Sequence, residues 1–295
     1  MTAAPIVAFD MVAHDGVHVT AFKAAPAGAP RAVVQIAHGM AEHFSRYRRV
    51  TNALTTAGFA VYGQDHRGHG ASAAAHGLGS FGPGGFAAVV DDMAALTDVA
   101  RTENPGAPVI LRGHSMGSFA SQLYLLAHHA DLAGLVLSGT AAVDAMRDAL
   151  IASGRPQTPN AMNAPFEPAR TGFDWLSRDE AEVDAYVADP LCGFALTDAS
   201  RVSVFEQAAG ARGDPRLSNV RADLPVLVIS GQFDPVTGPD QVFARALIDS
   251  YAASGLGRID HKVYPGGRHE MFNEINRDEV VTDLLAWLDA ALIQD

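Results

Sequence analysis

The stretch Leu111-Arg112-Gly113-His114-Ser115-Met116-Gly117-Ser118 decides how the rest of the chain is interpreted. It follows the apolar run Pro108-Val109-Ile110 and precedes a pattern of helical spacing over residues 119–130. The stretch therefore predicts a strand, a sharp turn and a helix in immediate succession. A serine at the tip of such a turn projects its hydroxyl outward, provided that the residues two before and two after it are small. Gly113 and Gly117 meet that condition.

Composition sets the broad class of protein. The chain has 295 residues, of which 48% are hydrophobic and 18% charged, enough to bury a large core. Its net charge of −12 argues against binding nucleic acid or an anionic membrane through a basic face. The single cysteine, Cys192, excludes an internal disulfide and is expected to be a packed thiol. Residues 1–10 lack the pattern of a signal peptide, and no apolar run is long enough to span a bilayer. These features predict a cytoplasmic protein.

The order of elements predicts an α/β fold. Residues 6–12 and 17–24 are expected to form a hairpin. Buried strands are predicted at 32–37, 59–63, 109–111, 132–137, 224–229 and 260–264, and helices at 47–57, 86–103, 119–130, 239–254 and 278–292. Such alternation is typical of a mainly parallel central sheet with helices on both faces.

The alternation stops after Thr140 and resumes near residue 224. Residues 141–216 hold prolines and short helical patterns at 178–187 and 200–209, without a run that resembles a buried strand. We therefore expect an inserted helical domain at 141–216, which divides the core into residues 1–140 and 217–295.

The candidate nucleophile, Ser115, needs a base within hydrogen-bond reach, and the base needs an acid that fixes its tautomer. Asp234 follows the predicted strand 224–229, and His269 lies in a loop after the strand 260–264. Both therefore fall at the carboxyl ends of strands, where open α/β sheets bind ligands. The order Ser115, Asp234, His269 along the chain suits a catalytic triad.

Each member of this set also has a plain structural interpretation. Asp234 alone could fill a turn or cap the next helix, and His269 alone could be a solvated loop histidine. Glu270 could replace Asp234 as the acid only if the loop folded differently. We interpret the three residues together as catalytic, because their order and placement agree.

Acyl transfer also requires two N–H donors for the negatively charged oxygen of the tetrahedral intermediate. One is the backbone N–H after the nucleophile, at Met116. The second is expected from the loop after the strand 32–37, where Gly39 allows close approach and Met40 supplies the N–H.

Three motifs carry a resemblance to a known family. Residues 38–47 (HGMAEHFSRY), 65–72 (DHRGHGAS) and 113–117 (GHSMG) resemble the HGxxEHxxRY, DxRGHGxS and GHSMG signatures of the monoglyceride lipase and lysophospholipase branch of the α/β-hydrolases. Residues 189–194 (DPLCGF) are similar to a segment in the cap of bacterial members, which we interpret as a structural turn. Ser118 departs from the pattern, because the family commonly has a third glycine there.

The resemblance implies an α/β-hydrolase fold with a cap over a channel for an acyl chain. It also implies cleavage of carboxylic esters, of the monoacylglycerol or lysophospholipid type, without a cofactor, and transient contact of the cap with a lipid surface. Residues that could line the channel or its rim, or pack the cap onto the core, are Met146, Leu150, Ile151, Met162, Phe166, Phe173, Trp175 and Leu176.

Other sites and functions remain open at this level. Twelve histidines invite a metal site, but no HExxH or comparable ligand spacing occurs, so we predict none. His66 and His69 flank a glycine-rich turn and are expected to be structural hydrogen-bonding residues. The same triad could serve a small-molecule esterase, an amidase or a peptidase, and the fold could also carry a non-catalytic binding protein. The oligomeric state cannot be inferred.

Overall fold

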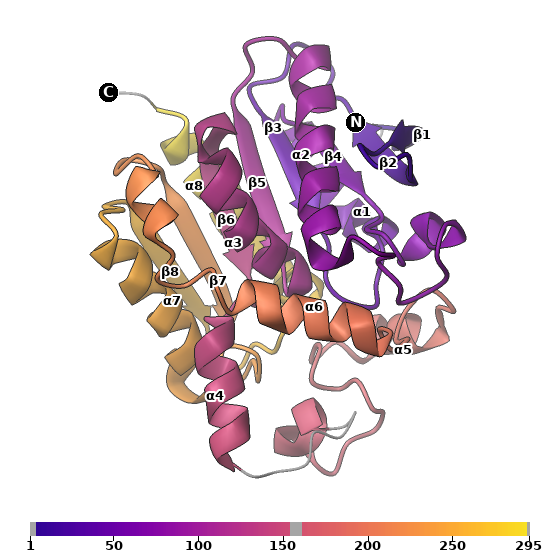
Figure 1. The fold of residues 1–295 in the computed structure, drawn as a ribbon, viewed down its shortest axis with the longest axis vertical. Helices are drawn as coiled ribbons and strands as arrows, with labels where there is room; N and C mark the ends of the chain where they lie inside the picture. Colours follow the sequence, from indigo (N-terminus) through magenta and orange to yellow (C-terminus); the bar gives the residue numbers. More distant parts are fainter. Residues whose placement is uncertain (1–3, 154–160, 294–295) are drawn as a thin grey trace.

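The computed structural model describes residues 4–153 and 161–293. Its centre is an eight-stranded sheet in the order β1-β2-β4-β3-β5-β6-β7-β8 (Figure 1). The strands are β1 Val7–Val12, β2 His18–Ala24, β3 Val33–Ala37, β4 Ala60–Gln64, β5 Val109–His114, β6 Leu132–Ser138, β7 Val226–Gly231 and β8 Ile259–Tyr264. The β1–β2 and β2–β4 pairs are antiparallel and all other pairs are parallel, as predicted.

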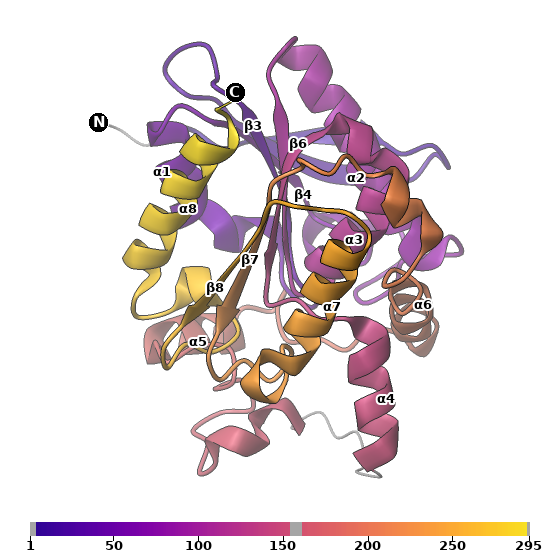
Figure 2. The ribbon, with the colours of Figure 1, turned by 90° about the vertical axis from the view of Figure 1, so that its left-hand side faces the viewer.

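Helices cover both faces of the sheet (Figure 2). One face packs against α1 (Arg48–Thr56) and α8 (Arg277–Ala291), and the other against α2 (Gly85–Glu103), α3 (Met116–His128) and α7 (Val242–Ala253). Successive residues of the central strands alternate between the two cores, and β3 to β7 are buried along their whole length except at the half-buried Ala133 of β6. Burial on both faces explains their continuous apolar runs in the sequence. The predicted α/β-hydrolase fold is confirmed.

Two helices begin three residues away from their predicted starts, for local reasons, while the other predicted core helices begin within one residue. α3 begins at Met116 rather than 119, because Ser115 turns the chain directly from β5 into the helix. α7 begins at Val242 rather than 239, because Asp240 (φ 51°) and Gln241 (φ 64°) adopt left-handed conformations that end the preceding short 3₁₀ turn.

The chain between β6 and β7 has a different character. Its helices are α4 (Val143–Ser153), α5 (Glu180–Ala188) and α6 (Asp198–Ala208), and it contributes no strand within the described residues. Both ribbon views place α4 and α5 beyond the carboxyl ends of the strands (Figures 1 and 2). The sequence did not predict α4, whose inward side is limited to Val143 and Met146. We refer to the described part of 141–216 as the β6–β7 segment.

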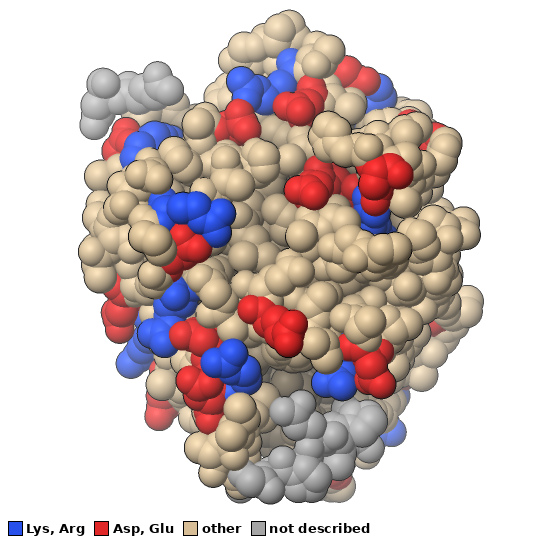
Figure 3. Space-filling model, in the orientation of Figure 1, with Lys and Arg blue, Asp and Glu red and all other residues tan. Residues whose placement is uncertain are grey.

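The surface is mixed in charge. On the face drawn in Figure 3, acidic and basic side chains lie interspersed among larger areas of uncharged residues. Of the helices in the described residues, none combines the length and the apolar character needed to cross a membrane.

Candidate active site

Ser115 stands in a strained turn between β5 and α3. Its φ of 51° and ψ of −121° are unfavourable for any residue with a side chain, and the turn is held by a hydrogen bond from its N–H to the Ser138 carbonyl at 2.9 Å. A Cβ at Gly117 would lie 2.3 Å from the Ala37 carbonyl oxygen, and one at Gly113 would lie 2.4 Å from Ser121 Oγ. Only glycine fits at these two positions, so the neighbouring backbones can approach the serine.

The departure at Ser118 is accommodated within this turn. Its buried hydroxyl donates a hydrogen bond to the Ser115 carbonyl at 2.6 Å and lies 2.9 Å from Thr140 Oγ1. The hydroxyl therefore supports the first turn of α3 and does not approach His269 or Asp234 through any hydrogen bond of the described residues.

The structure brings Asp234 and His269 together although 35 positions separate them in the chain. Asp234 lies in the turn after β7, and its Oδ1 is 2.9 Å from Nδ1 of His269. The same oxygen accepts the N–H of Val236 at 2.9 Å, so the aspartate also fills the turn that the sequence allowed. Glu270 points elsewhere, toward Arg46, at 2.5 and 2.7 Å. Asp234, and not Glu270, is therefore the carboxylate that holds the imidazole.

The imidazole of His269 lies in a narrow slot. Its ring centroid is 4.7 Å from that of His114 and 4.8 Å from that of Trp175. Gly139, immediately after β6, closes the edge of the slot. A Cβ there would be 2.7 Å from Cε1 and 2.9 Å from Nδ1 of His269. The ring can therefore take few orientations, and one of them places Nδ1 against Asp234.

Charge and burial act in opposite directions on this histidine. Burial by itself would lower the pKa of His269, but the Asp234 carboxylate outweighs that effect and the pKa is raised above its ordinary value of 6.5. Burial lowers the pKa of the neighbouring His114 well below the ordinary value, so its ring stays neutral. The site therefore contains one histidine that readily accepts a proton and one that does not.

The turn after β3 lies beside the serine. A Cβ at Gly39 would be 3.3 Å from Cβ of Ser115, and Ala41 adopts a φ of 55°. The buried carboxylate of Glu42 holds this turn in place through hydrogen bonds. Its Oε1 accepts the N–H of Gly39 at 2.5 Å and the hydroxyl of Tyr47 at 2.6 Å. The structure places Met40 at the tip of the turn, half-buried, and Met116 at the first position of α3.

Two pairs of hydrogen bonds join the β6–β7 segment to the backbone of the loop that carries His269 and of the turn after β3. The N–H groups of His269 and Glu270 donate to the carbonyls of Trp175 and Leu176, at 3.3 and 2.7 Å. The Ala41 carbonyl accepts both the Tyr186 hydroxyl and the N–H of Gly193, each at 2.9 Å. We call these pairs the histidine clamp and the turn clamp.

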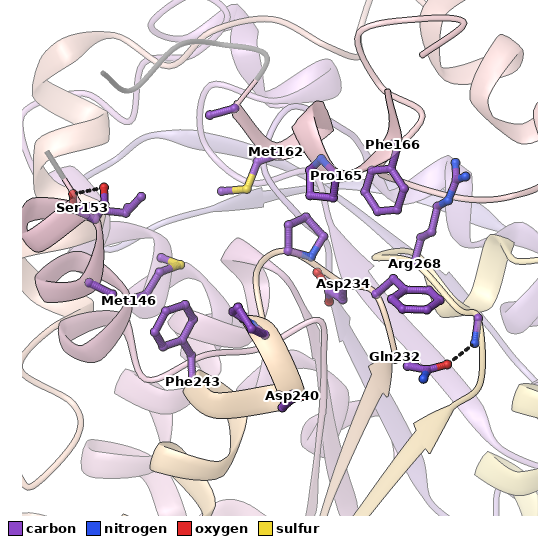
Figure 4. Close-up of a pocket in the computed structure, with 18 of the residues that line it drawn as sticks. Met146, Ser153, Met162, Pro165, Phe166, Gln232, Asp234, Asp240, Phe243 and Arg268 are labelled. Atoms are coloured by element: carbon purple, nitrogen blue, oxygen red, sulfur yellow. Dashed lines mark hydrogen bonds between the residues drawn. The ribbon is translucent and has the colours of Figure 1, made fainter. Parts of the chain in front are cut away.

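A cavity of about 930 Å³ opens next to Asp234. Figure 4 shows Met146 and Phe243 on one side, Met162, Pro165 and Phe166 on another, and Asp234 between them. Of the eight candidate lining residues, Met146, Leu150, Met162 and Phe166 line this cavity. Phe173, Trp175 and Leu176 pack instead with Tyr186 and Cys192, and Ile151 is 70% exposed. Ser115 does not line the cavity, which reaches the site from the side of the aspartate.

Some residues of the site were missed or misjudged from the sequence. Gly139 and the backbone of Trp175 were not singled out, although a glycine directly after a buried strand is a usable signal for Gly139. Nδ1 of His69 donates a hydrogen bond to the Arg67 carbonyl at 2.9 Å, as expected. The prediction for His66 was wrong, because its buried ring nitrogens have no partner among the described residues. Burial lowers its pKa well below the ordinary value and keeps the ring neutral.

Comparison with known proteins places the chain in a family. The family model described as serine aminopeptidase, S33, matches residues 28–276. The monoacylglycerol lipase of Mycolicibacterium smegmatis is 34% identical over 268 residues, which cover 88% of each chain. The monoglyceride lipase of Mus musculus is 27% identical over 268 residues, covering 89% of this chain and 84% of that protein.

Solved structures agree with this placement. A thermostable carboxyl esterase from Bacillus coagulans, solved in complex with glycerol, has a TM-score of 0.84 at 28% identity and covers 99% of this chain and 100% of its own. A monoglyceride lipase from Saccharomyces cerevisiae shares the fold, with a TM-score of 0.76 at 20% identity, over 100% of this chain and 97% of its own. The chain thus belongs to the serine aminopeptidase S33 family of α/β-hydrolases, in the branch that contains the monoglyceride lipases.

Proposed function

We propose that this protein is a serine hydrolase that cleaves carboxylic esters of the monoacylglycerol or lysophospholipid type. One observation carries the proposal: His269 Nδ1 lies 2.9 Å from Asp234 Oδ1 at the edge of the sheet that also presents Ser115 in a strained turn. The relation to monoacylglycerol lipases supports the same reaction.

The roles in the reaction follow from this arrangement. Because Asp234 holds Nδ1, the other ring nitrogen of His269 takes the proton of Ser115 as the serine attacks the ester carbonyl. The N–H groups of Met40 and Met116 stabilise the oxygen that becomes negative. His269 then gives its proton to the leaving alcohol, and water, activated in the same way, releases the acid from the acyl-enzyme. Asp234 stays ionised and supports the imidazolium.

The substrate assignment is based on the cavity beside Asp234 and on the β6–β7 segment. We propose that residues 141–216 act as a cap, and that an acyl chain enters along the apolar side chains of Met146, Leu150, Met162, Phe166 and Phe243. Transient contact of this cap with a lipid surface and a cytoplasmic location belong to the same proposal.

An aminopeptidase on the same triad is disfavoured by the carboxylates around the site. Such an enzyme needs an acidic side chain that is free to pair with the substrate's α-ammonium group. Glu42 and Glu270 are both paired with Arg46, and Glu274 is paired with Arg178. Asp240 also lines the cavity, but it is solvent-exposed, and an ion pair with the ammonium group there would contribute little because water screens it. We therefore favour an uncharged ester over a peptide amine.

The test compares wild type with Ser115→Ala on short and long p-nitrophenyl esters, a monoacylglycerol, a lysophosphatidylcholine and an aminoacyl p-nitroanilide. Loss of the nucleophile should lower turnover by about 10⁶. Ser118→Ala is the matched control. It removes a hydroxyl three positions away and should keep activity within about tenfold.

The outcomes separate the candidate functions. Serine-dependent release of acid from the monoacylglycerol or the lysolipid supports the proposal and identifies the head group. Activity confined to short esters would be consistent with the proposed mechanism but would refute the lipid assignment. Activity on the anilide would favour a peptidase. If a fluorophosphonate fails to label Ser115 in the folded protein, the chain is a binding protein.

A further inference from the structure

A cluster of three potential metal ligands lies at one side of the turn clamp. His43 ends the turn after β3, and Asp189 and Cys192 flank the turn after α5. One donor atom from each residue, the imidazole nitrogen, a carboxylate oxygen and the thiol sulfur, lies within 4.8 Å of the other two. We propose that His43, Asp189 and Cys192 bind a divalent cation of the zinc type.

The donor set is suited to zinc. Zn²⁺ prefers histidine nitrogen and cysteine sulfur, accepts carboxylate oxygen, and often takes three protein ligands with one open position. The side chains of His43 and Asp189 are 12% and 31% exposed, so a cation can enter from solvent and keep a water as its fourth ligand. No metal motif is recognisable along the chain, because two ligands come from one turn and the third lies 146 positions before Asp189.

The backbone holds the three ligands in place before any cation arrives. The N–H of Leu191 donates to Oδ1 of Asp189 at 2.8 Å, which leaves Oδ2 directed at Nε2 of His43, 2.9 Å away. The N–H of Cys192 donates to the Asp189 carbonyl at 3.0 Å and closes the turn. The next N–H, from Gly193, donates to the Ala41 carbonyl and fixes this turn against the turn that carries His43.

The charged groups around the thiol are mostly acidic. Three carboxylates, those of Asp189, Glu42 and Glu270, act on the Cys192 sulfur against one guanidinium, that of Arg46. On binding, the S–H bond breaks, its proton goes to solvent and a sulfur–metal bond forms. Nε2 of His43 also gives its proton to solvent and the ring takes one up at Nδ1, so that Nε2 and Oδ2 of Asp189 exchange their hydrogen bond for two metal–ligand bonds.

Cobalt(II) gives the sharpest test, because Cys192 is the only cysteine of the chain. A cobalt–thiolate charge-transfer band can therefore come from one residue alone. Full-length protein without a polyhistidine tag is dialysed against chelator and titrated with Co²⁺, and zinc binding is measured by calorimetry. We expect one cation per chain, a charge-transfer band that zinc abolishes, and a higher unfolding temperature with zinc.

Variants at each ligand separate this site from the other histidines. Cys192→Ala should abolish the band, and His43→Gln and Asp189→Asn should each weaken zinc binding at least about tenfold. Asp189→Asn keeps an oxygen for the Leu191 N–H, so it tests the ligand in a turn that still folds. The control is His18→Gln, which removes the exposed His18–Asp10 pair, 2.6 Å apart and without a thiol. No band in folded wild type, or equal zinc affinity in wild type and all three ligand variants, would overturn the proposal.

Discussion

The sheet edge and the β6–β7 segment reach the same site through different kinds of atoms. The sheet edge contributes side chains, those of Ser115, Asp234 and His269, each at the carboxyl end of a strand. The β6–β7 segment contributes carbonyls at Trp175 and Leu176, together with the N–H and hydroxyl of the turn clamp.

The candidate reacting groups therefore come from the sheet edge, and groups that position them come from the β6–β7 segment. A strand end fixes where a side chain points, so the reacting groups depend on residue identity at a few positions. A carbonyl of the β6–β7 segment offers the same acceptor whatever its side chain is, so residues 175 and 176 can vary and still hold the loop of His269, whereas the turn clamp also uses the side chain of Tyr186. Substitutions at the sheet edge should therefore change turnover far more than substitutions in the clamps.

The largest expected effect comes from the acid at the sheet edge. Asp234→Asn keeps the size of the side chain and the hydrogen bond from Val236, but it no longer favours the productive tautomer or the imidazolium. We expect kcat to fall by about 10⁴ with unfolding temperature and circular dichroism close to wild type. Activity within about tenfold of wild type would place the acid at another residue.

Gly139→Ala tests the shape of the slot without touching a reacting group. Its φ is +58°, and the new methyl would press on Cε1 of His269 at 2.7 Å. Displacement of the imidazole should lower kcat by about 10². Gly106→Ala is the matched control, because Gly106 also has a positive φ (81°) but no atom within 4 Å of the added Cβ. Equal losses in the two variants would mean that backbone strain, and not the contact with His269, is responsible.

The pH dependence reports on the pair of His269 and Asp234. His269 must be neutral to act as a base, and its pKa is raised above 6.5, so kcat/KM should fall about tenfold per pH unit below an inflection higher than that value. Asp234→Asn should move the inflection to lower pH. Because the folded pKa is the higher one, this pair stabilises the fold fully below pH 6.5, and the contribution is lost as the pH rises through the folded pKa.

The control for this profile lies in the β6–β7 segment. Arg170→Gln removes an exposed ion pair with Asp184, at 2.5 Å, and should leave the inflection unchanged. An inflection at or below 6.5 in wild type, measured on an ester whose hydrolysis is limited by acylation, would contradict the balance of charge and burial argued for His269.

The smallest expected effect is in the turn clamp. Tyr186→Phe removes one of the two hydrogen bonds to the Ala41 carbonyl, while the one from Gly193 remains. We expect kcat to fall about fivefold and the free energy of unfolding by about 1 kcal/mol. Tyr251→Phe is the control, since that buried hydroxyl has no partner among the described residues. A loss above about 100-fold would give the phenol a direct role in the reaction, and wild-type turnover would refute a positioning role.

Most of the fold could be predicted from the sequence because buried parallel strands have an unmistakable composition. The runs at β3, β5, β6 and β7 are rich in buried apolar residues, and the residues after them carry most of the candidate chemistry. Helix starts were less predictable, as at α7, because the left-handed residues Asp240 and Gln241 are not marked by glycine.

Part of the candidate site could likewise be predicted from the sequence, and part could not. Ser115, Asp234 and His269 could be named because their residue types and order are specific to one chemistry, and their roles stay predictions that the experiments above test. The clamps could not be predicted, because a carbonyl such as that of Trp175 carries no sequence signal. The cluster at Cys192 was invisible for a related reason, since His43 meets it only after the chain has folded.

The two clamps divide the β6–β7 segment into parts that can be exchanged and parts that cannot. Residues 161–166 and α4 line the cavity and make none of the clamp contacts, whereas residues 175–193 hold the loop of His269 and the turn after β3. A chimera that takes α4 and the 161–166 stretch from a relative should therefore inherit that relative's preference for chain length at native turnover. A graft that extends across 175–193 would have to rebuild the catalytic geometry as well, so retargeting of this scaffold is best confined to the first stretch.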